Sequence, residues 1–132
     1  MSGETELQQL LRAMSPVLLE HDYVFSTIRN ARYGDYSETC PIASFTENEG
    51  LTLVVLKNAA EQSGLSYQGV FRCITLGVHS SLEAVGLTAA VSGVLADHGI
   101  SANIIAAYFH DHIFVPSEFA DQALGILLTL NK

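Results

Sequence analysis

The chain has 132 residues, of which 48% are hydrophobic and 15% are charged. This composition excludes an intrinsically disordered protein, because disorder requires low hydrophobicity and high charge. Fourteen acidic residues against six basic ones give a net charge of −8, which repels phosphate backbones, so we expect no nucleic-acid partner.

No apolar run approaches the roughly 20 residues of a membrane-spanning helix, so we expect no membrane partner. The first six residues are polar and have none of the features of a signal peptide. The two cysteines, Cys40 and Cys73, form no CxxC motif, and we expect them to be reduced thiols. These observations predict a cytoplasmic protein.

The first half of the chain begins with a helical pattern and continues with strand-like segments. Leu7, Leu10, Leu11 and Met14 have the i, i+3, i+4, i+7 spacing of an amphipathic helix, which Pro16 ends or kinks. Strands are assigned where aromatic and β-branched residues gather, and a flap where turn residues do. The predicted elements are a helix over 7–14, a strand over 23–28, a loop or flap over 30–41, strands over 42–46 and 51–56, and a short helix over 58–63.

The second half opens with the apolar segment 68–78 (QGVFRCITLGV), which predicts one long strand. The clearest helix of the chain follows, with Leu87, Val91 and Leu95 on one face and Gly99 closing it. The predicted elements are a strand over 68–78, a helix over 81–98, strands over 103–109 and 112–115, and a last helix that begins at Ser117.

A faint internal repeat relates the two halves. Short stretches of similar residues recur in the same order, separated first by 77 positions and then by 60. Chance similarity between amphipathic segments is the alternative interpretation. The aligned stretches are 17–21 with 94–98, 53–55 with 113–115, and 60–62 with 120–122.

Each half therefore has two predicted helices but is one strand short of a ferredoxin-like βαββαβ unit. The strand over 68–78 can serve both units, as the last strand of one and the first strand of the other. We predict an α+β fold of two intimately joined ferredoxin-like units, whose antiparallel sheets are covered by helices on one face. The predicted boundary separates an N-terminal half, 1–66, from a C-terminal half, 67–132, with the central strand shared.

Three runs in the second half resemble the ACT family. They are HSSLEAVGL at 79–87, GISANI at 99–104 and YFHDHIFVP at 108–116. The last run is similar to a bacterial ACT subfamily of undefined function and to the tandem ACT units of the animal cytosolic arginine sensor. The resemblance implies tandem ACT-type units, which commonly sense amino acids. In the first half Gln9 stands where Gly86 does, so an equivalent second site is in doubt.

The junction after the strand over 68–78 is the candidate ligand site. Glycine lets a backbone approach a ligand closely, and the free N–H groups of a helix start attract a carboxylate. Glu83 could bind the ammonium group of an amino acid, although Ser80-x-x-Glu83 also has capping-box spacing. The resemblance places the ligand between this junction and the strand after the helix. The predicted ligand-binding residues are Ser80, Ser81, Glu83, Val85, Gly86, Asn103, Ile104 and Asp111.

The run His110-Asp111-His112 admits a second interpretation. Alternate strand residues share a face, so the two histidines could chelate zinc with Asp111 or His79. A polar hairpin turn explains the same run, and we predict no metal, no cofactor and no catalytic residue. Signatures such as G-x-S-x-G, the P-loop and HExxH are absent from the sequence.

The favoured hypothesis is therefore a regulatory module that binds an amino acid or a similar metabolite and catalyses no reaction. An interaction module that dimerises or docks on an enzyme is the alternative, because unpaired sheet edges are natural association surfaces. A small enzyme using His110, Asp111 and His112 is a weaker third hypothesis. The resemblance and the exposed edges also predict a homodimer.

Overall fold

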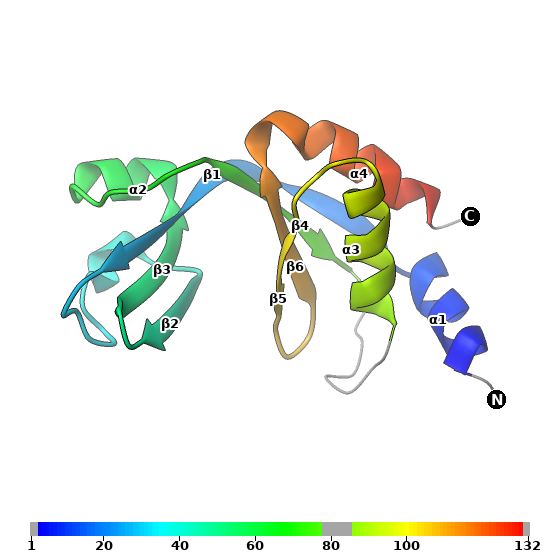
Figure 1. The fold of residues 1–132 in the computed structure, drawn as a ribbon, viewed down its shortest axis with the longest axis horizontal. Helices are drawn as coiled ribbons and strands as arrows, with labels where there is room; N and C mark the ends of the chain where they lie inside the picture. Colours follow the sequence, from blue (N-terminus) through cyan, green and yellow to red (C-terminus); the bar gives the residue numbers. More distant parts are fainter. Residues whose placement is uncertain (1–2, 78–85, 131–132) are drawn as a thin grey trace. The chain divides into compact units, whose positions relative to one another are not determined.

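The computed structural model of the chain describes residues 3–77 and 86–130. It contains six strands, four α-helices and two 3-10 turns within these ranges (Figure 1). In chain order they are α1 Gly3–Arg12, β1 Pro16–Ile28, η1 Ser37–Thr39, β2 Ala43–Glu47, β3 Gly50–Leu56, α2 Lys57–Gln62, β4 Phe71–Leu76, α3 Leu87–Asp97, β5 Asn103–Ala106, β6 Asp111–Pro116, η2 Ser117–Phe119 and α4 Ala120–Thr129.

The strands form one sheet in the order β2-β3-β1-β4-β6-β5. Neighbouring strands run antiparallel in the β1–β3, β2–β3 and β5–β6 pairs. The strand order repeats on the two sides of the sheet centre. From the centre outward, one side has β1, β3 and β2, and the other has the corresponding strands β4, β6 and β5. Helices α2 and α4 follow the corresponding strands β3 and β6. This arrangement confirms the predicted α+β class of two joined ferredoxin-like units.

The chain divides into two compact units. Unit 1 consists of residues 1–20 and 72–132, and unit 2 consists of residues 21–71. Strand β1 contributes its first five residues to unit 1 and its remainder to unit 2. The predicted boundary between residues 66 and 67 stays a prediction.

The core of unit 1 lies between its helices and one face of its strands. Alternate residues of a strand share a face, and Ile74 and Leu76 of β4 pack with Ile113 and Val115 of β6 in one buried cluster. Helix α3 contributes residues spaced by four to the same cluster, because that spacing keeps side chains on one side of a helix. These helical residues are Leu87, Val91 and Leu95.

Unit 2 has a smaller core and a single α-helix. Its fully buried cluster is formed mainly by alternate residues of β3, Leu51, Leu53 and Val55, together with Val24 and Ala60. The connection between β1 and β2 holds only the 3-10 turn η1, whereas the corresponding connection in unit 1 holds α3. Each half of the sequence contains two α-helices as expected, α1 and α2 in 1–66 and α3 and α4 in 67–132. In space, however, α1 belongs to the unit that contains α3 and α4.

Several expected elements differ in extent. Strand β1 starts at Pro16 rather than residue 23, so aligning 17–21 with 94–98 pairs a strand with a helix and is wrong. The other two aligned stretches fall in β3 with β6 and in α2 with α4. The central strand is confirmed over Phe71–Leu76, while Gly69, with φ +77°, lies before it. No helix among the described residues is both long and apolar enough to cross a bilayer.

Candidate functional site

Gly86 occupies the start of α3 and has a conformation that favours glycine. Its φ of +103° and ψ of −28° place it in the left-handed region, and its carbonyl accepts the first helical hydrogen bond from Ala90 N at 2.8 Å. A Cβ atom at this position would lie 3.3 Å from Leu7 Cδ2 of α1. The structure thus explains this glycine by its backbone conformation and by the close packing of α1.

The residues before Gly86 lie outside the described part of the chain. They include the predicted ligand contacts Ser80, Ser81, Glu83 and Val85, as well as His79 of the zinc hypothesis. The capping box and the ammonium-binding role of Glu83 both stay predictions.

Strand register separates the predicted contacts on β5 and β6. Asn103 pairs with Phe114 and Ile104 pairs with Ile113. Because adjacent strand residues point to opposite faces, Ile104 packs against the helix-covered core, whereas the exposed Asn103 lies on the other face. Asp111 shares its face with Ile113, since the two are separated by one residue.

Asp111 is a mostly buried carboxylate. It is the first residue of β6, pairs with Ala106, and exposes only 9% of its surface. A buried carboxylate requires polar or charged partners, which makes Asp111 a candidate ligand contact among the described residues.

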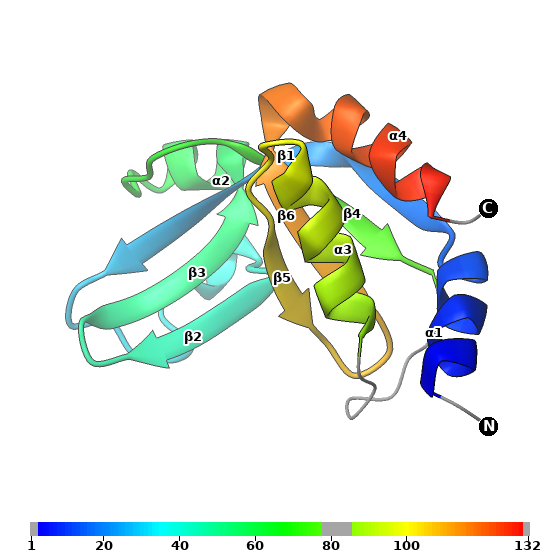
Figure 2. The ribbon, with the colours of Figure 1, turned by 45° about the vertical axis from the view of Figure 1, so that its right-hand side comes forward.

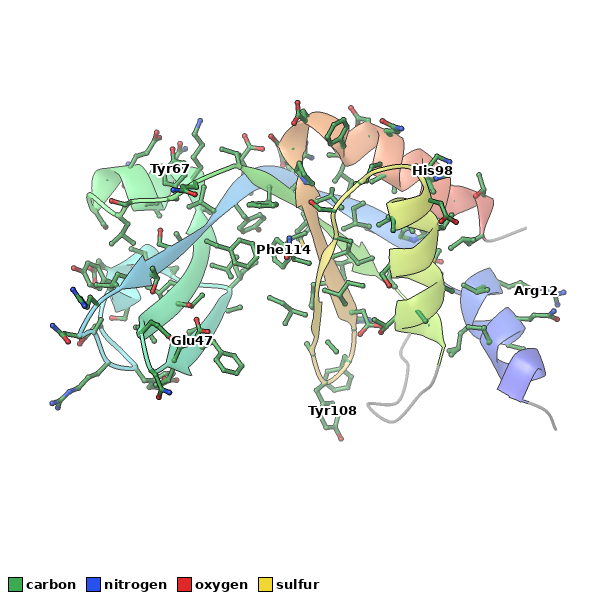
Figure 3. All side chains as sticks on the ribbon, viewed as in Figure 1. Arg12, Glu47, Tyr67, His98, Tyr108 and Phe114 are labelled. Atoms are coloured by element: carbon green, nitrogen blue, oxygen red, sulfur yellow. The ribbon has the colours of Figure 1, made fainter. Side chains whose placement is uncertain are left out.

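The turn between β5 and β6 lies at the same end of unit 1 as the start of α3 (Figure 2). The turn is closed by a 3.0 Å hydrogen bond from Ala107 N to the His110 carbonyl. The turn therefore comes earlier than expected, because β5 ends at Ala106 rather than residue 109 and Asp111 already belongs to β6. Tyr108 stands at its tip (Figure 3), and its ring packs edge-to-face on Phe109 with 5.0 Å between centroids. Asp111 directly follows this turn, which places it at the end of the unit where α3 begins.

His112 lies on the opposite sheet face from Asp111 and contacts β4. Its Nδ1 is 2.9 Å from Thr75 Oγ1, which is in turn 3.9 Å from Cys73 Sγ. Burial lowers the pKa of His112, with a further lowering from the charge of His110 and an opposing effect of Asp111. Burial likewise raises the pKa of the Cys73 thiol. This geometry makes Cys73 a buried, protonated thiol rather than a nucleophile.

The zinc hypothesis requires His110 and His112 to share a ligand set. His112 uses one ring nitrogen on Thr75, while Asp111 lies between the two histidines and therefore faces the other way. No group of three or more metal-binding side chains lies close together in the described ranges.

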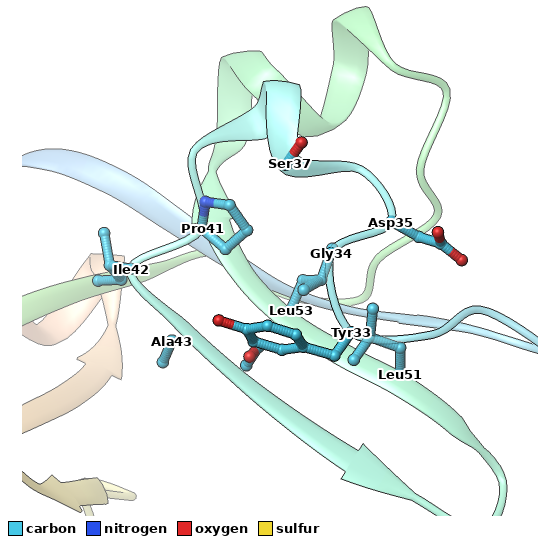
Figure 4. Close-up of a pocket in the computed structure, with 10 residues that line it drawn as sticks. Tyr33, Gly34, Asp35, Ser37, Pro41, Ile42, Ala43, Leu51 and Leu53 are labelled. Carbon is cyan, nitrogen blue, oxygen red and sulfur yellow. The ribbon is translucent and has the colours of Figure 1, made fainter.

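Two clefts in unit 2 were not predicted from the sequence. The first has a volume of about 400 Å³ and lies between β3 and the flap, residues 30–41 (Figure 4). The second has about 590 Å³ and lies between the turns 29–32 and 47–50. Their signal in the sequence is the turn-rich segment 30–41, which predicts a flap but not what the flap covers.

The ACT domain family matches the chain twice, over residues 2–72 and 69–129. A Vibrio cholerae protein of unknown function, described as a possible transport protein, is 53% identical, with a TM-score of 0.89 and coverage of 99% of this chain and 100% of that one. No curated protein matches.

More distant structures share the fold. An Agrobacterium tumefaciens protein is 15% identical with a TM-score of 0.73, over 88% of this chain and 87% of that one. The ligand-free regulatory subunit of aspartate kinase from Thermus thermophilus is 13% identical with a TM-score of 0.62, over 89% and 97%. The two family matches lie in tandem and together span almost the whole sequence, and the chain therefore belongs to the ACT domain family.

Proposed function

We propose that the protein is a regulatory module that binds an amino acid and catalyses no reaction. ACT domains are typically regulatory ligand-binding modules, and one structural relative is the regulatory subunit of aspartate kinase from Thermus thermophilus. The observation that carries the proposal is the buried carboxylate of Asp111 at the end of unit 1 where α3 begins.

Two complementary charges at that end suit a zwitterion. The first N–H groups of a helix have no partner within the helix, and the helix dipole favours an anion there. Gly86 supplies no side-chain cap to α3, and the carboxylate of an amino acid is the proposed partner of these groups. Asp111 supplies the negative charge for its ammonium group.

The proposed contacts are those expected from the sequence. Gly86 and Asp111 define the anchoring groups, and Ile104 supplies an apolar contact on the same face as Asp111. Asn103 would contribute through its backbone, because β5 is an edge strand and its outer backbone groups have no neighbouring strand. The remaining proposed contacts are Ser80, Ser81, Glu83 and Val85.

Thermal-shift measurements with each of the twenty amino acids test the proposal. A ligand at about 100 times its dissociation constant stabilises the folded state by roughly 2.7 kcal/mol, which raises the melting temperature by several degrees. We expect the shift to disappear in Asp111→Asn and to persist in Asp22→Asn, a matched control at an exposed aspartate of unit 2. The proposal fails if no amino acid at 10 mM raises the melting temperature, or if Asp111→Asn responds like the wild type.

The alternative is an interaction module, and one observation favours it. Edge strand β2 carries Phe45 with 70% of its surface exposed, and unpaired edges with exposed aromatic residues favour association. Light scattering on the purified chain would show a dimer that Phe45→Ser weakens, with no response to amino acids. We also propose a homodimer and a cytoplasmic location for the regulatory module itself.

A further inference from the structure

The flap of unit 2 stands where unit 1 has a helix. The connection from β1 to β2 corresponds to the connection from β4 to β5, which contains α3. This connection is not an α-helix in the structure, and Asn30, Tyr36 and Cys40 in it have positive φ values of 66°, 63° and 51°. A flap covers less of a sheet face than a helix with an apolar stripe does, so a cleft remains between the flap and β3.

Local hydrogen bonds hold the flap in one conformation. Arg32 N donates to Asp35 Oδ2 at 2.8 Å, and the buried Thr39 donates its hydroxyl to the Tyr36 carbonyl at 2.7 Å. At its end Ile42 N donates to the Val54 carbonyl of β3 at 2.9 Å. Residues in sparsely populated backbone conformations persist where surrounding contacts hold them, and they cluster at ligand clamps. The cleft is therefore bounded by an ordered segment.

The floor and wall of the cleft are apolar and aromatic. Leu51 and Leu53 of β3 lie beneath the cleft and expose only 1% and 2% of their surfaces, whereas Ile42 in its wall exposes 49%. Tyr33 lies at the opening with its ring across the space between flap and β2 (Figure 4), and it exposes 83% of its surface. A volume of about 400 Å³ is within the range of small-molecule sites. An exposed aromatic ring over apolar residues suits a planar apolar group.

The polar groups of the cleft determine the charge of its ligand. Ser44 pairs with Leu53, and residues directly opposite on neighbouring strands share a face, so the Ser44 hydroxyl lies on the cleft side. Asp35 is the one charged residue among those that line the cleft. Its side chain points away from the cleft (Figure 4), and one of its oxygens accepts from Arg32 N. Its negative charge at the rim attracts a cation to the entrance and repels an anion.

We propose that this cleft binds a small aromatic amine. The ligand ring packs against Tyr33 and Ile42, a ring hydroxyl reaches Ser44, and the ammonium group lies toward the Asp35 rim. An amino acid suits the cleft less well, because its carboxylate would meet the charge of Asp35. The site is separate from the proposed amino-acid site, since all of its residues belong to unit 2.

Titration of the full-length ¹⁵N-labelled protein with tyramine at low ionic strength tests the proposal. We expect amide shifts in 33–44 and 51–53, and much weaker shifts with 4-hydroxyphenylacetate, which has the same ring but a carboxylate. Asp35→Asn keeps an acceptor for Arg32 N and should weaken tyramine binding by up to about fivefold, as loss of an exposed ion pair does. Tyr33→Ala should weaken it by about two- to tenfold.

Tyr108→Ala is the matched control, because Tyr108 is also exposed, at 69%, but lies in unit 1. It should bind tyramine as the wild type does. Equal shifts with the amine and the carboxylate, shifts confined to residues outside the flap, or no shifts at 10 mM tyramine would each overturn the proposal. A negative result for tyramine would not count against the proposed amino-acid site, because that site is tested by Asp111→Asn and by amide shifts in unit 1.

Discussion

Replacing Gly86 by alanine should destabilise the protein by about 1–3 kcal/mol, the cost of a non-glycine residue in a sparsely populated backbone region. The position has φ +103° because α3 starts there from a left-handed residue. A second, smaller cost arises because the new Cβ would lie 3.3 Å from Leu7 Cδ2. The Leu7 side chain can shift by a few tenths of an ångström, so we expect backbone strain to account for most of the loss of stability.

Urea unfolding followed by circular dichroism measures this cost. With a denaturant slope of about 2 kcal/mol per molar urea, a loss of 2 kcal/mol moves the midpoint by about 1 M. Gly93→Ala is the matched control within α3, because a Cβ at Gly93 meets no atom within 4 Å. It should stabilise the helix by about 0.4–1 kcal/mol.

A double mutant separates the two causes. If backbone strain accounts for most of the loss, Gly86→Ala should lower the free energy of unfolding by the same amount in the wild type and in a Leu7→Ala background, within about 0.5 kcal/mol. The reasoning is refuted if Gly86→Ala is as stable as the wild type, or if its cost disappears once Leu7 is shortened.

Further expectations concern packing, thiols and pH. Leu127→Ala should lower the free energy of unfolding by about 2–5 kcal/mol, because Leu127 is fully buried. Leu128→Ala should lower it by under about 1 kcal/mol in the same urea assay, because Leu128 is 46% exposed. Equal losses for the two variants would contradict this packing. In the native protein a thiol reagent should modify the exposed Cys40 but spare the buried Cys73 until unfolding; mass spectrometry showing the reverse would refute it. Burial lowers the pKa of His112 from its usual 6.5. The neutral His112 side chain therefore contributes to stability above pH 6.5, and this contribution is lost as the pH falls through the pKa of His112 in the folded state. His112→Gln should therefore lose less stability on acidification, and an unchanged pH profile would count against this cause.

Helix α3 and strand β3 could be predicted from the sequence. Leu87, Val91 and Leu95 repeat every four residues, and all three are buried. In β3 the apolar run itself indicated a strand, and Leu51 and Leu53 prove to be buried together. Such predictions succeed because residue spacing directly determines which side chains share a face.

The start of β1 could not be predicted in the same way. Glu20, His21 and Asp22 are exposed and have poor strand propensity, yet they lie within a strand of 13 residues. The strand is continuous because it lies between β3 and β4 in the sheet. Backbone hydrogen bonds to residues far away in the sequence outweigh local preference at such positions.

For the candidate site, the sequence by itself predicted Gly86 and Asp111 as ligand contacts through a motif, and the same motif indicated the family of the chain. Only the tertiary structure showed that Leu7 packs on Gly86, that Asn103 and Ile104 face opposite sides, and that a cleft lies under the flap. Local spacing determines which helices and strands form, because their hydrogen bonds and side-chain directions repeat over a few residues. Which surfaces meet, and where space remains between them, depends on pairing and burial between distant segments.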